Sequence, residues 1–272
     1  MRLFLSGLRK LRGRPASLVT VCLLLGLLVL IIIATATVSQ RSSGTQAQRV
    51  LVLVTFPAAY DLILSFMFGL GGLFAVIYGA AIAGSEWSWG TLKNAVARGE
   101  SRSRYMLLSF AAIAVMIAIG LVVTFVVGVG AAIVGAKVAG VSTAGLGDSD
   151  TLGRLPEEFA RGWFAVTEEA ALGFAIATLA RSQLAGIGAG IAFYFGETFA
   201  TIFLPDIVKY LPFAVARASV NIGGAAADAA NAGGPGAAAA LPADTALVLV
   251  GVWLVGSLVV ALGFSERAEI TG

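Results

Sequence analysis

The chain has 272 residues, of which 58% are hydrophobic and 12% are charged, and its formal net charge is +3. Soluble domains carry about 45–50% apolar and about 25% charged residues, so this composition departs from theirs in the direction of a membrane protein. The small net charge gives no reason to expect a nucleic-acid partner.

Several classes of site are excluded or disfavoured by what the chain lacks. It has one cysteine, Cys22, and no histidine. An internal disulfide and a histidine-based catalytic triad are therefore excluded, and a zinc, copper or haem site is not expected. No GxxxxGK[ST] phosphate loop is present. We expect neither enzyme activity nor a cofactor in this chain.

Residues 1–17 are basic and partly apolar. Phe4, Leu8 and Leu11 follow one helical face, with most of the arginines off it. This pattern predicts an amphipathic helix in the cytoplasmic membrane interface. The alternative is a basic flank that only sets the topology.

Six segments have the length and apolar composition of a membrane-crossing helix of roughly 20 residues. We therefore predict an all-α polytopic membrane protein with a single transmembrane domain over residues 18–264 and a tail over 265–272. The third segment would be roughly 45 Å long, so it should tilt or project into water. The expected spans are 18–38, 56–83, 105–136, 163–180, 184–204 and 246–264.

Lysine and arginine are concentrated before the first span and between the second and third. By the positive-inside rule, both termini and residues 85–104 are expected to be cytoplasmic. We expect a multi-pass protein of the plasma membrane. The polar external loop 137–162 is expected to be irregular. The external loop 205–245 begins with an amphipathic stretch broken by Pro205 and Pro212, which predicts a short re-entrant or interfacial helix pair. Its Ala/Gly-rich remainder predicts a surface loop.

The polar hairpin 85–104 is the most informative segment. Ser85 is predicted to cap a helix start, and Ser101 is predicted to cap the third span. Trp87 and Trp89 can anchor at lipid headgroups or dock in a pocket. On spacing alone, the alternative is an ordinary loop whose charges only enforce topology.

Glu86, then Gly90-Thr91-Leu92-Lys93, then Ser101-Arg102, resembles the signature of type 2 ABC transporter permeases. That family has an acidic residue at the end of the second span, then Gly-Thr-Leu/Ile-Lys and a Pro-x-Ser-Arg turn. The basic amino-terminal arm, the six spans, Arg181-Ser182, and the ending with Phe264, Arg267 and Glu269 are also similar. Gly99 stands where the family usually has proline, and Phe110 stands where lysine is common.

The resemblance implies the permease subunit of an ATP-driven exporter of an amphipathic drug, lipid or peptide. Such a subunit pairs with a second copy or a homologous permease, and with two separate cytoplasmic ABC ATPase subunits that hold ATP and magnesium. The hairpin would be the coupling helix that tilts spans one, two and five. The implied coupling residues are Glu86, Gly90, Thr91, Leu92, Lys93 and Arg102.

Four carboxylates fall within or beside the expected spans: Asp61, Glu168, Glu169 and Glu197. Span counting places all four at a similar depth in the outer half of the membrane, where they would form a substrate pathway that favours cationic or amphipathic cargo. Alternatively they cap helices, pair with Arg217 or Lys209, or reach the headgroups.

Gly186 and Gly190 form a GxxxG spacing that predicts a dimer seam, although a glycine-rich chain can contain it by chance. Two other functions are weighed against export. A secondary transporter or channel without an ATPase predicts an inverted repeat and charges near the bilayer centre. A non-transporting membrane subunit predicts a closed interior.

Overall fold

The computed structural model describes residues 8, 11, 13, 15–41, 51–220 and 241–268. Every regular element in these ranges is a helix, which confirms the all-α prediction. In chain order they are α2 (Pro15–Arg41), α4 (Ala58–Ser88), α5 (Thr91–Ala97), α6 (Arg102–Ala139), the 3-10 helix η1 (Ala144–Gly147), α7 (Ser149–Ala180), α8 (Gln183–Ala200), α9 (Pro205–Val208), α10 (Pro212–Ser219) and α12 (Ala243–Arg267).

Five described helices, α2, α4, α6, α7 and α12, are long and apolar enough to cross a membrane. The chain is therefore a multi-pass helical membrane protein. α8, which corresponds to the expected fifth span, is not among the five: it has 18 residues and contains Glu197.

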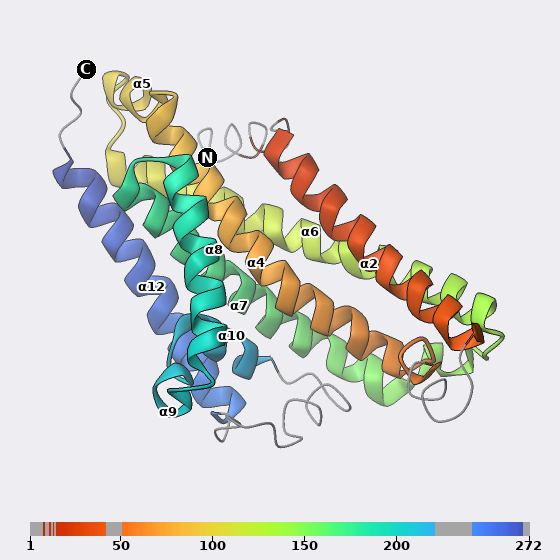
Figure 1. The fold of residues 1–272 in the computed structure, drawn as a ribbon. Coiled ribbons are helices and arrows are strands. Elements are labelled where there is room, and N and C mark those ends of the chain that lie inside the picture. The colour runs from red at the N-terminus through yellow and green to blue at the C-terminus, as the bar shows by residue number, and fades with distance from the viewer. Residues whose placement is uncertain are drawn as a thin grey trace.

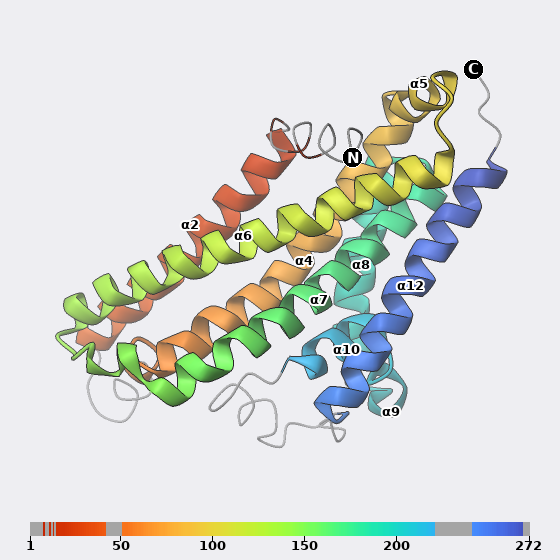
Figure 2. The ribbon, with the colours of Figure 1, turned by 180° about the vertical axis from the view of Figure 1, so that it is seen from behind.

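The helices form an elongated bundle with α7 in the middle, in contact with α4, α6, α8, α10 and α12. α5 and the last described residues of α12 lie at one end, which we call the hairpin end, and α9 lies toward the other (Figure 1). Seen from behind, α2 lies at the edge of the bundle and packs chiefly on α6 (Figure 2).

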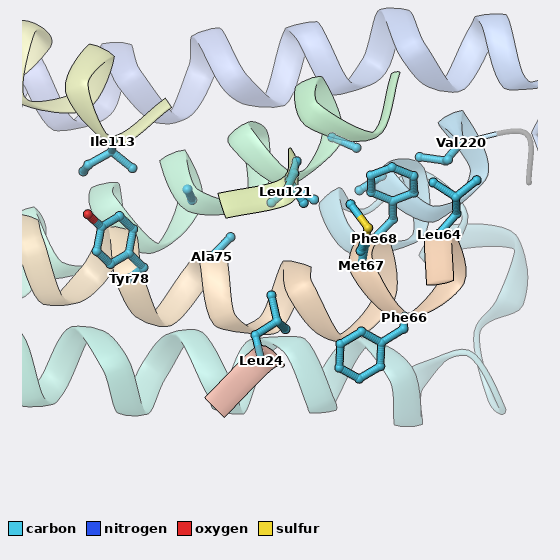
Figure 3. Packing of buried hydrophobic residues seen from close by; sticks show 14 of the residues in the cluster. Leu24, Leu64, Phe66, Met67, Phe68, Ala75, Tyr78, Ile113, Leu121 and Val220 are labelled. Carbon is cyan, nitrogen blue, oxygen red and sulfur yellow. The ribbon is translucent and has the colours of Figure 1, made fainter. Parts of the chain in front are cut away.

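The tightest helix contact joins α4 and α7 through glycine. A β-carbon built at Gly79 would lie 2.1 Å from the carbonyl oxygen of Ala170, and one at Gly173 would lie 2.1 Å from that of Val76. Small residues let membrane helices approach this closely. Toward the start of α4, larger side chains such as Met67 and Phe68 belong to the buried hydrophobic cluster (Figure 3).

The prediction that residues 137–162 form an irregular loop is wrong over most of its length. α6 continues to Ala139, and α7 begins at Ser149 rather than at residue 163. Asp148 caps α7 by accepting hydrogen bonds from the Thr151 amide at 3.0 Å and the Thr151 hydroxyl at 2.6 Å. Ion pairs of i,i+4 spacing, such as Arg161–Glu157 at 2.9 Å, stabilise the polar extension.

The stretch after α8 folds as the two short helices α9 and α10. Phe213 of α10 packs on Val76 and Leu172, while Val215 packs on Val250 of α12. The expected amphipathic helix over 1–17, the Ala/Gly-rich loop and the last tail residues lie largely outside the described residues.

The α4–α7 contact predicts a difference between two glycines. Gly173→Ala forces the α4 backbone away, and we expect a loss of about 1–3 kcal/mol of stability, as for other overpacked cores. Gly71→Ala is the control, because no atom lies within 4 Å of its added methyl group. Thermal unfolding in detergent measures both. Equal melting temperatures would contradict the contact.

The Asp148 cap predicts a pH dependence. Hydrogen bonds from the Thr151 side chain and backbone hold the pKa of Asp148 below its ordinary value of 3.8. A lowered folded-state pKa means that the cap stabilises α7 above the unfolded-state pKa and loses this effect as pH falls through the folded-state value. The melting-temperature difference between wild type and Asp148→Ala should therefore be full at neutral pH and shrink in acid. A difference that is constant with pH would contradict it.

Candidate functional site

Between the end of α4 and the start of α6, the hairpin consists of α5 and two tight turns. Gly90 precedes α5 with φ +66°, and Gly99 follows it with φ +86°. Proline is fixed near φ −65°, so a chain with proline at position 99 could not make this turn. Gly99, which stands where the ABC permease pattern has proline, therefore makes a turn that proline could not make.

α5 has one buried and one exposed face. Leu92 is 2% exposed and Ala95 is buried, so this side packs on α4 and α6. Lys93 and Asn94 face outward, and Trp89 just before the helix is 62% exposed. The hairpin thus presents a charged and aromatic outer surface while its inner surface is anchored.

Glu86 lies at the centre of the hairpin's anchorage. Its side chain is buried, and its carboxylate accepts hydrogen bonds from the Tyr105 hydroxyl at 2.7 Å and from the Thr91 hydroxyl. One carboxylate therefore joins the end of α4, the start of α5 and the start of α6.

Arg102 joins the start of α6 to the end of α12. Its guanidinium donates to the carbonyl oxygens of Ser265 and Glu266, each at 3.3 Å, and of Ala268 at 2.7 Å. In return, the Glu266 carboxylate accepts from the Ser103 amide at 3.1 Å and from the Ser103 hydroxyl. The Arg102 guanidinium thus lies at the carboxyl end of α12, and the Glu266 carboxylate lies at the amino end of α6. The dipoles of these two helices favour the charges that they receive.

Arg181, between α7 and α8, completes the hairpin end. Its guanidinium lies 5.6 Å from the Trp87 ring centre and 5.2 Å from that of Phe264. These cation–π contacts connect the ends of α4 and α12 with the α7–α8 turn.

The prediction that Ser85 caps a helix start is wrong, and the prediction for Ser101 is right in position only. Ser85 lies inside α4 and bonds the Ile82 carbonyl, so it starts no helix. Ser101 occupies the position before α6, but its side chain makes no capping bond. Glu266, distant in sequence, binds the Ser103 amide of the first α6 turn instead.

The four carboxylates do not lie together. Asp61, near the start of α4, lies close enough to Arg154 and Glu158 of α7 for their charges to interact. Glu168, Glu169 and Glu197 form a second group with Arg217, which we call the carboxylate cluster.

The carboxylate cluster lies midway along the bundle, because a β-carbon built at Gly72, in the middle of α4, would meet the Glu169 carboxylate. The expected outer-half depth of Glu168 and Glu169 assumed that the fourth span begins at residue 163, whereas α7 begins at Ser149. Both residues therefore lie farther from the start of their helix than expected.

Glu197 caps α10. Its carboxylate accepts hydrogen bonds from the amides of Phe213, at 3.2 Å, and Ala214, and lies 3.6 Å from the Arg217 guanidinium. This arrangement agrees with the helix-capping alternative and with pairing to Arg217.

Gly186 and Gly190 face the chain's own helices. A β-carbon at Gly186 would lie 2.3 Å from the Ala177 β-carbon of α7, and one at Gly190 would lie 2.6 Å from a Val76 methyl of α4. The face expected to form a dimer seam is therefore occupied within the chain.

A cavity of about 70 Å³ lies between α2, α4 and α6. Its wall is mainly apolar, and the Ser17 and Tyr78 hydroxyls, 3.0 Å apart, bring polar groups to it. None of the four carboxylates lines it. In the described part of the chain, no group of three or more carboxylate or thiol side chains is arranged to hold a metal ion.

Comparison with protein-family models gives no match, and comparison with curated proteins gives none either.

The anchorage of the hairpin predicts that Glu86→Ala loosens it. The part-buried hydroxyls of Thr91 and Tyr105 lose their hydrogen bonds to the carboxylate, and Thr91 keeps the Glu86 carbonyl oxygen at 3.3 Å as an acceptor. A hydrogen bond to a charged group typically contributes about 1.5–3 kcal/mol. Hydrogen–deuterium exchange over residues 90–101 should rise. Glu100→Ala, within the same hairpin, is the matched control. Unchanged exchange in Glu86→Ala would show that the carboxylate does not hold the hairpin.

Proposed function

We propose that the chain is the permease subunit of an ATP-driven exporter, with six spans of which α8 is the short fifth. Separate ABC ATPase subunits in the cytoplasm would act on α5. The observation that supports this best is the position of Glu86, whose buried carboxylate holds α5 to both α4 and α6. A short helix held in this way moves together with the long helices rather than independently of them.

The path of the motion follows from the contacts at the hairpin end. A force on the outer face of α5 passes to α4 and α6 through Glu86, and from α6 to α12 through Arg102. Arg181 extends this path from α4 to the α7–α8 turn through its contact with the Trp87 ring. ATP-driven closure of the partner subunits would thus shift several helices as a unit, which is the usual form of domain-closure motion.

The partner surface would be the outer face of α5. Lys93, Asn94 and Arg98 are exposed there, so a complementary ATPase groove should carry acidic and polar groups. A second permease copy or a homologous permease completes the transporter, with both termini of each in the cytoplasm. The cargo is an amphipathic drug, lipid or peptide.

One observation favours a second candidate, a secondary transporter without an ATPase. Such transporters have ionisable residues near the bilayer centre, and Glu169 of α7 lies against Gly72 in the middle of α4. Cargo uptake into vesicles that contain this chain alone, driven by an ion gradient without ATP, would support it over the exporter.

Co-expression with the ATPase encoded beside its gene tests the exporter proposal. The ATPase should co-purify with a tagged chain, and Lys93→Glu should reduce that recovery about tenfold, as expected for a loss near 1.4 kcal/mol. Lys137→Glu, at the opposite end of α6, is the control. Glu86 is unsuited to charge reversal because its side chain is buried.

Failure of any ATPase to co-purify, or full recovery and full activity of the Lys93→Glu complex, would contradict the coupling role.

A further inference from the structure

The two adjacent glutamates of the carboxylate cluster are buried, and three of their four carboxyl oxygens have no hydrogen-bond partner. Glu168 is 0% exposed and Glu169 is 1% exposed. Both carboxyl oxygens of Glu168 and one of Glu169 accept no hydrogen bond, and the neighbouring Thr167 hydroxyl also has no partner. An ionised carboxylate in such a place loses its hydration and receives nothing in return.

The space between Glu169 and α4 is filled. The Glu169 carboxylate lies directly on Gly72, where even a methyl group would collide with it. The cavity beside α2 does not reach Glu168 or Glu169. A cationic head group therefore has no room between Glu169 and α4, whereas a proton needs none.

Few charged groups of the described residues lie near Glu168 and Glu169. The described parts of α4, α6 and α12 have charged residues only near their ends, so none of these three helices brings a charge to the middle of α7. α8 contributes Glu197 and the hydroxyl of Tyr194, and α10 contributes Arg217. Three carboxyl groups therefore face a single guanidinium.

Hydrogen bonds decide which carboxyl group is the anion. Glu197 has two backbone amide donors at the start of α10, and Arg217 lies 3.6 Å away. Each of these contacts stabilises a negative charge. Arg217 thus forms its ion pair with Glu197, and neither Glu168 nor Glu169 forms an ion pair with a described cation.

We propose that Glu168 and Glu169 form an internal proton-binding site in which each carboxyl group holds a proton at neutral pH, while Glu197 remains ionised beside Arg217. The ligand is the proton itself. This proton site does not depend on whether a partner ATPase acts on the chain, so its test is separate from that of the exporter proposal.

Loss of a proton from this site has a structural consequence. A new negative charge at Glu169 would compete with Glu197 for Arg217, whose side chain is 40% exposed. The cap on α10 would weaken, and α10 would loosen from α7 and α8. Proton binding and the position of α10 are thus coupled through one guanidinium.

Infrared spectroscopy of the full chain in lipid nanodiscs tests the assignment directly, because a protonated carboxyl group has a C=O stretch that an ionised one lacks. At neutral pH the wild type should show this band. Glu168→Gln and Glu169→Gln should each remove about one proton's share of it. Arg217→Gln should increase it, because Glu197 then takes up a proton.

Asp150→Asn is the control, since this exposed carboxylate lies on the same helix. Glutamine closely matches the size of a protonated glutamate, so the variants should fold, and the wild-type spectrum tests the proposal even without them. A wild type that lacks the band at neutral pH would overturn the proposal. So would a band that depends on only one of Glu168 and Glu169.

Discussion

The contact between α4 and α7 is the constraint on which most of the described structure depends. Two backbones meet where Gly79 and Gly173 have no side chains, and this approach brings Gly72 onto the Glu169 carboxylate. α4 then carries Glu86 out to the hairpin end, while α7 carries Arg181 to the same place. One helix pair thus connects the hairpin and the carboxylate cluster, which lie at different depths of the bundle.

The sequence was sufficient to predict what depends on local composition. Apolar runs predicted the helical class and the approximate places of α2, α4, α6 and α12. The start of α7 was missed because its first turns are polar, and hydropathy does not register a helix held by an Asp148 cap and i,i+4 ion pairs. The sequence did contain a signal for this helix start. Asp148 precedes Thr151 by three residues, which is the spacing of a helix cap, and Glu157 precedes Arg161 by four, which is the spacing of a helical ion pair.

What could not be predicted are the contacts between residues distant in sequence. The carbonyls at the end of α12 bind Arg102, and the GxxxG face of α8 packs inside the chain. Neither contact can be predicted from a single sequence, because the sequence gives the chemistry of an arginine or a glycine but not the residue that it contacts. The charge balance around Glu168 likewise required knowing that Arg217 is already engaged by Glu197.

The edge position of α2 has a consequence for biosynthesis. α2 packs chiefly on α6, where Gly128 and Gly135 receive Leu28 and Ile32. A chain is made from its amino terminus, so α2 enters the lipid while its main partner has not yet been synthesised. Its nearly continuous aliphatic sequence suits a helix that must remain alone in the bilayer until α6 follows. Insertion and assembly of this end of the bundle are therefore separate steps.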